Sequence, residues 1–150
     1  MSRCSTRPSR IFAFPAAKQF AYAGTTRLAL GGREHVQQAI ASADTAIRLY
    51  RSAEDDDQSV GDLFAAHVDL ARGHMLLGDL DGTEEMLGFV LDSPPERMSA
   101  SIVRRLTALG RELGGPQYGE AQQAAHLRER LQHTAVLAAS PAAHPPELPT

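Results

Sequence analysis

The chain has 150 residues, of which 43% are hydrophobic, 22% are charged and only 5% are aromatic, and its formal net charge is −3. This profile is typical of one globular domain with a core of alanine and leucine, and it excludes a collagen, a disulfide-rich scaffold and a fully disordered chain. No apolar run approaches the ~20 residues that a membrane-spanning helix needs, so we expect a soluble protein with no membrane partner.

Charge is distributed unevenly along the sequence. Residues 1–51 carry eight basic residues against two acidic ones, residues 52–92 carry one against eleven, and residues 93–150 carry six against five. One interpretation of this pattern is that the charges lie on solvated helix faces. The other is that the protein binds a charged partner or associates head to tail with its own copies. The single cysteine, Cys4, cannot form an internal disulfide, and no apolar signal segment follows it. Both features predict a cytoplasmic location.

The composition divides the chain into three regions. Residues 1–13 are expected to form a disordered basic arm. Residues 140–150 contain four prolines and are expected to form a disordered tail, because proline interrupts both helices and strand ladders. Residues 14–139 remain as one helical domain.

The bounds of the first three predicted helices follow mainly from residues typical of helix ends. Helix one is expected to start at Pro15, a residue suited to the first helical position, and to stop before Gly31. Helix two is expected over about 34–51, where apolar residues recur at steps of three and four. Ser59 is the expected cap of helix three, which should end at Gly78.

The last three predicted helices show the clearest apolar periodicity. Helix four is expected over about 81–92, and Pro94 follows it. Helix five presents on one face Ile102, Leu106, Leu109 and Leu113. Helix six, after Pro116, presents on one face Ala124, Leu127, Leu131, Thr134 and Ala138. We therefore expect an all-α protein of about six helices.

The helices are expected to pair as similar hairpins. Gly24 lies seven residues before Gly31, and Ala71 lies seven residues before Gly78. Small residues where two helices cross, followed by a glycine in the turn, are typical of tetratricopeptide repeats. The two turn glycines are 47 residues apart, more than the repeat length of ~34, so the predicted right-handed array is degenerate.

Several stretches of the chain resemble one family of proteins. They are FPAAKQ (14–19), YAGT (22–25), AIRLY (46–50), DLARGHMLLGD (69–79), VLDSPPERM (90–98) and LRERL (127–131). Together they resemble the C-terminal, tetratricopeptide-like portion of actinobacterial helix-turn-helix (XRE-type) transcriptional regulators. In that family the helical array senses a signal or mediates assembly, behind an N-terminal DNA-binding domain.

The resemblance implies a non-enzymatic module that binds a peptide, a protein or its own copy. Only about a dozen residues precede the array, too few for a three-helix DNA-binding unit, so no direct contact with nucleic acid is expected. The alternative is a truncated remnant of a regulator with no independent activity. An isolated module should unfold in a cooperative thermal transition, whereas a remnant should not.

Three residues are the predicted partner-binding site. The inner face of a tetratricopeptide array is lined mainly by the first helix of each pair. The register places Lys18, Thr25 and Arg72 on that face. Cations there suit a peptide carboxylate or an acidic segment.

The histidines and acids do not predict a metal site. His67 and His74, like His126 and His133, are seven residues apart, about 10.5 Å along a helix and too far for two imidazoles to share one ion. The segment 79–85 resembles the middle of a calcium loop but lacks both anchoring carboxylates, so it is interpreted as a turn followed by the acidic start of a helix.

No other motif predicts catalysis or a cofactor. The glycine clusters match no phosphate-binding pattern, and no nucleophile is paired with a base in the sequence. Five arginines of helices five and six form a candidate basic patch with no interleaved aromatic residue. They are Arg104, Arg105, Arg111, Arg128 and Arg130.

Overall fold

The computed structural model describes residues 10–52 and 60–140. Within these residues the chain is all-α, which confirms the prediction of an all-α protein of about six helices. The α-helices are α1 (Arg10–Leu30), α2 (Arg33–Ser52), α3 (Val60–Leu76), α4 (Leu80–Leu91), α5 (Ala100–Leu113) and α6 (Gln122–Ala139), with short 3-10 helices η2 (Pro95–Arg97) and η3 (Pro116–Tyr118). Cys4, the predicted cap Ser59 and nearly all of the predicted tail lie outside the described residues.

Helix α1 begins earlier than the sequence predicts. It starts at Arg10 rather than at Pro15, so residues 10–13 of the expected arm belong to the helix. Pro15 lies in the second turn, where its missing N–H removes one backbone hydrogen bond. The helix nevertheless continues through Pro15 to Leu30, with the loss confined to that one hydrogen bond near its N-terminus.

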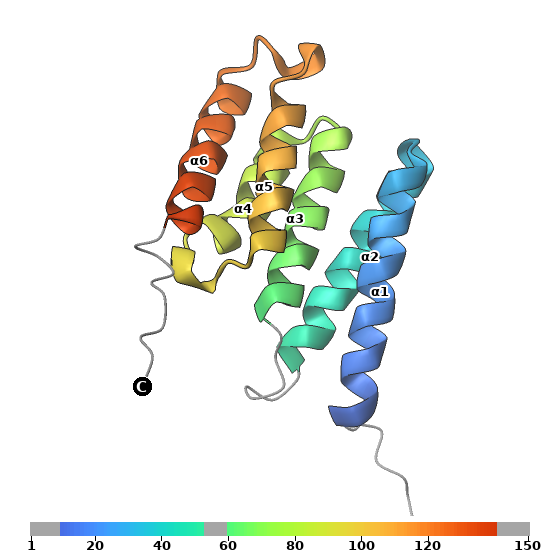
Figure 1. Cartoon of the computed structure of the whole chain (residues 1–150). Helices are drawn as coiled ribbons and strands as arrows, with labels where there is room; N and C mark the ends of the chain where they lie inside the picture. The colour runs from blue at the N-terminus through green and yellow to red at the C-terminus, as the bar shows by residue number, and fades with distance from the viewer. Residues whose placement is uncertain (1–9, 53–59, 141–150) are drawn as a thin grey trace, which may run out of the picture.

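The helices form three hairpins. Helix α1 packs on α2, α3 on α4, and α5 on α6, while α3 also contacts α1, α2 and α5 (Figure 1). The first two turns contain glycines in the left-handed region, at φ 72° for Gly31, 85° for Gly32 and 81° for Gly78. Residues with a Cβ rarely adopt this conformation, so the predicted turn glycines are confirmed.

Side-chain caps fix the starts of two later helices. The Asp79 carboxylate accepts a hydrogen bond of 2.9 Å from the Gly82 backbone N–H, and α4 begins at Leu80 and ends at Leu91, each one residue earlier than predicted. Ser99 accepts from the Ile102 N–H at the start of α5. Asp79 is thus the N-cap of α4, and the segment that resembles a calcium loop forms the predicted turn and acidic helix start.

The core is continuous across the hairpins because α3 contributes to two clusters. One cluster joins α3 to α4, α5 and α6, and the other joins α3 to α1 and α2. The four leucine and isoleucine positions predicted for α5 are all buried. In α6 the structure buries Ala135, whereas Thr134, predicted to face inward, is half-buried.

Two glycines allow helices to approach closely. A Cβ on Gly24 would lie 3.4 Å from the Ala39 carbonyl oxygen, where α1 crosses α2. A Cβ on Gly73 would lie 2.6 Å from Cγ1 of Ile40, where α3 meets α2. These positions are where small side chains set the distance between helices.

We expect Gly73→Ala to lower the free energy of unfolding by about 1 kcal/mol, because the overlap with Ile40 outweighs the helix preference of alanine. Gly88→Ala is the matched control, since only the Asp92 carboxylate lies within 4 Å of the added Cβ. Chemical denaturation of both variants tests this expectation. An equal gain in stability for both substitutions would contradict the close approach at Gly73.

Candidate functional site

A groove crosses the face of the molecule formed by α1, α3 and α5. Its volume is about 430 Å³, and most of its lining comes from α3 and α5. Buried Val68 and Leu109 form an apolar floor, and charged side chains stand around it. We call this the α1–α3–α5 groove.

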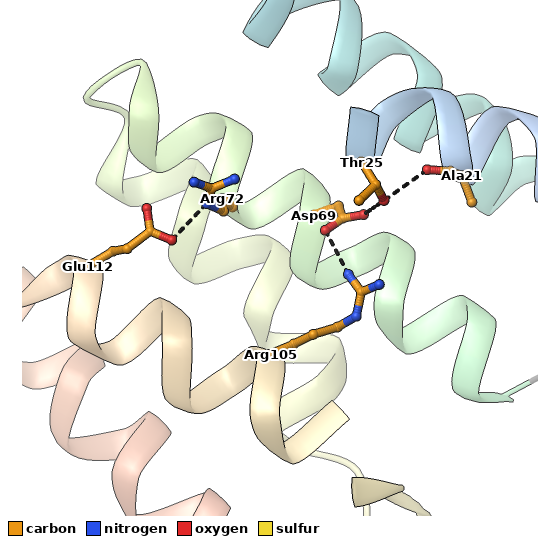
Figure 2. A network of polar contacts seen from close by, with 6 residues as sticks. All are labelled: Ala21, Thr25, Asp69, Arg72, Arg105 and Glu112. Atoms are coloured by element: carbon orange, nitrogen blue, oxygen red, sulfur yellow. Dashed lines mark hydrogen bonds and ion pairs between the residues drawn. The ribbon is translucent and has the colours of Figure 1, made fainter. Parts of the chain in front are cut away.

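Asp69 of α3 connects the three helices that form the groove. Nη1 of Arg105 on α5 donates to Asp69 Oδ1 at 3.0 Å, and the Thr25 hydroxyl of α1 lies 2.6 Å from Asp69 Oδ2 (Figure 2). The same hydroxyl lies 3.1 Å from the Ala21 carbonyl oxygen, so its single proton has two possible acceptors. The arrangement holds α1 and α5 to the central helix.

The Asp69 carboxylate is largely removed from solvent, with 11% of its side chain exposed. Burial raises the pKa of Asp69 above its ordinary value, and the hydrogen bond from Thr25 and the charge of Arg105 oppose that shift. The donors therefore compensate in part for the cost of desolvating the carboxylate.

We expect Asp69→Ala to lower the free energy of unfolding by about 2 kcal/mol, because it removes two hydrogen bonds to a shielded carboxylate and leaves Arg105 unpaired. The control is Asp44→Ala, whose pair with Arg48 at 3.5 Å is exposed on both sides. Its loss should cost less than about 0.5 kcal/mol. Equal urea midpoints for the two variants would argue against the role of Asp69.

A second ion pair lies farther along the groove. Nε of Arg72 on α3 donates to Glu112 Oε1 on α5 at 2.7 Å, and each side chain is 33% exposed (Figure 2). Arg72 thus has a carboxylate partner within the chain. The Arg72 guanidinium is therefore partly neutralised by Glu112, and it remains partly accessible from the groove.

Arg104 differs from the other two arginines of the groove. It is exposed, and the described residues offer it neither a hydrogen bond nor an ion pair. It also lines a second hollow of about 330 Å³, between the start of α5 and the end of α6. This hollow has apolar walls, including Met98, Val103 and Ala138, and we call it the α5–α6 hollow.

The structure brings together two of the three predicted site residues. Thr25 and Arg72 both line the α1–α3–α5 groove, each engaged with a carboxylate. Lys18 is half-buried two turns before Thr25 and is not among the residues that line this groove. The sequence placed Arg104 only in a candidate basic patch, because the partners that neutralise its neighbours are distant in sequence.

Ion pairs with acidic residues neutralise part of the predicted basic patch. Arg105 is bound to Asp69, and Nη2 of Arg130 lies 3.4 Å from Asp92 Oδ1. Two of its five arginines therefore face carboxylates of the same chain. Such neutralised arginines contribute little to counterion release on nucleic-acid binding.

Two of the described histidines, His67 and His74, have packing and capping contacts, whereas His35, His126 and His133 are exposed. His67 stacks on Phe89 with ring centroids 4.3 Å apart, and His74 lies 3.1 Å from the cap carboxylate of Asp79. Among residues 10–52 and 60–140, no three His, Cys, Asp or Glu side chains are grouped as metal ligands. None of the helices in these two ranges has the length and hydropathy needed to cross a bilayer.

Comparison of the chain with known protein families, with curated proteins and with solved structures gives no match.

Proposed function

We propose that the chain is a non-enzymatic interaction module that binds a peptide or a protein segment in the α1–α3–α5 groove. The observation that carries the proposal is the groove itself. It is open, it has an apolar floor, and it presents arginine and hydroxyl groups above that floor. Grooves of this kind offer an extended segment both apolar burial and polar contacts that fix its register.

We further propose that the hairpins are tetratricopeptide-like and that the module is the sensor or assembly part of a helix-turn-helix regulator. In support, the first helices of the hairpins, α1, α3 and α5, form the groove face, and α3 contacts both of its neighbours. Hairpins that bury their apolar faces only by stacking form extended binding surfaces of this type. The family resemblance of the sequence supports the same assignment.

A displayed library of random peptides, selected on the full chain, tests the binding function. Ala108 is exposed and lines the groove, so Ala108→Trp fills the groove without removing a hydrogen bond. We expect this variant to bind the selected peptides at least about tenfold more weakly than the unmodified chain, because the indole occupies the volume that the peptide needs.

Ala41→Trp is the control, because Ala41 is exposed on α2 and does not line the groove. This variant should bind the peptides as tightly as the unmodified chain, as measured by fluorescence polarisation. If no peptide is selected, or if both tryptophan variants bind equally well, the proposed function is wrong.

A further inference from the structure

The charges around the groove leave one positive charge without a partner. Arg72 is paired with Glu112 and Arg105 is paired with Asp69, at 2.7 Å and 3.0 Å. Arg104 stands beside them and, among the described residues, has no carboxylate partner. An anion that enters the groove therefore meets one arginine whose guanidinium is available without breaking an existing ion pair.

Arg104 has a hydroxyl neighbour on the same face of α5. Ser101 precedes it by three residues, and both side chains line the groove. Residues three apart on a helix are neighbours on its surface. A carboxylate held by the guanidinium of Arg104 is thus within reach of a second donor, the Ser101 hydroxyl.

The position of Arg104 also determines what lies next to that carboxylate. Arg104 lines both the α1–α3–α5 groove and the α5–α6 hollow. The hollow has a mainly apolar lining, which includes Met98 and Val103. A segment anchored at Arg104 can therefore place an adjacent apolar side chain in the hollow.

The two acidic residues of the groove limit the charge of the ligand. Asp69 and Glu112 line the same groove as Arg104. They neutralise two of its three arginines and would repel a second negative charge brought close to them. The excess charge of the groove therefore matches one carboxylate rather than a phosphate group or a polyanion.

We propose that Arg104, with the Ser101 hydroxyl, anchors a single aspartate or glutamate side chain of the partner segment, and that an apolar residue adjacent to it enters the α5–α6 hollow. This inference rests on the proposed function and names the chemistry of the partner. Arg72 and Arg105 act as positioning residues, since their pairs with Glu112 and Asp69 hold α3 and α5 together at the groove.

A double-substitution cycle with a selected peptide tests the anchor. In the best-binding peptide, the acidic residue is changed to its amide. We expect this change to weaken binding to the unmodified chain by about tenfold, the effect of losing a charge-assisted hydrogen bond. The same change should have no effect on binding to Arg104→Gln, because that variant has already lost the anchor.

The control is Arg111→Gln, since Arg111 is an exposed arginine of the same helix that does not line the groove. This variant should keep the tenfold effect of the amide change. A peptide with phosphoserine in place of the acidic residue should bind no more tightly than the acidic peptide.

Three outcomes would overturn the anchor. The first is that the selected peptides bind Ala108→Trp more weakly but contain no acidic residue. The second is that the change from acid to amide still weakens binding to Arg104→Gln. The third is that the phosphoserine peptide binds more tightly than the acidic peptide. Each would leave the groove as a binding surface, because Ala108→Trp tests that separately.

Discussion

Replacing Leu106 with alanine is expected to lower the free energy of unfolding by about 3 kcal/mol. Leu106 lies on α5 and is fully buried in the cluster that joins α3, α4, α5 and α6. Its truncation loses apolar burial and leaves a cavity that the surrounding helices fill only in part. Thermal unfolding followed by circular dichroism measures the loss, and the transition should remain cooperative.

Leu137→Ala is the matched control, since Leu137 on α6 is 44% exposed. Its substitution should change the free energy of unfolding by less than about 0.5 kcal/mol. Similar effects at the two leucines would contradict the packed core. A chain with no cooperative transition at all would favour the alternative of a remnant without independent activity.

The second large effect is a loss of stability in acid through His67. Burial, together with the charge of Arg51, lowers the pKa of His67 to about 4, against an opposing effect of a backbone hydrogen bond at Met86. The His67 ring stacks on Phe89, and its Nε2 lies 3.4 Å from the guanidinium Nη2 of Arg51. A protonated ring would therefore lose solvation and face a second cation.

The sign of the pH dependence follows from the two pKa values. Above pH ~6.5 the ring is neutral in both the folded and the unfolded chain, so His67 adds no pH dependence there. As the pH falls from about 6.5 to 4, the unfolded chain binds a proton that the folded chain does not. The free energy of unfolding then decreases, by on the order of 2–3 kcal/mol.

Urea midpoints measured between pH 7.5 and 4.5 test this dependence. His67→Phe preserves an aromatic ring against Phe89 and removes the titrating group, so it should lose less stability in acid than the unmodified chain. His133→Gln alters an exposed histidine of α6 and should behave like the unmodified chain. If His67→Phe and the unmodified chain lose the same stability in acid, protonation of His67 is not the cause of the loss.

Helix positions were predictable from the sequence because they depend on local patterns. The steps of three and four in α5 identify its buried face, and the turn glycines identify the ends of α1 and α3. The start of α1 was not predictable in the same way. Pro15 is suited to the first helical turn, yet the second turn also tolerates it.

The groove was only partly predictable. The register placed Thr25 and Arg72 on a common face, and the structure finds both in the α1–α3–α5 groove. The partners of its arginines are 36 and 40 positions away in the chain. Which arginine remains unpaired depends on how α3 and α5 are placed relative to each other, and no spacing rule within one helix contains that information.

Mapping the binding surface by NMR shows directly whether peptides bind in the α1–α3–α5 groove. The full chain, labelled with nitrogen-15, is titrated with a selected acidic peptide, and backbone amide shifts are followed. We expect the largest shifts at Thr25, Ser101, Arg104 and Ala108, around the α1–α3–α5 groove. Shifts concentrated instead around Glu84 of α4 and Gln123 of α6, which do not line this groove, would contradict this assignment.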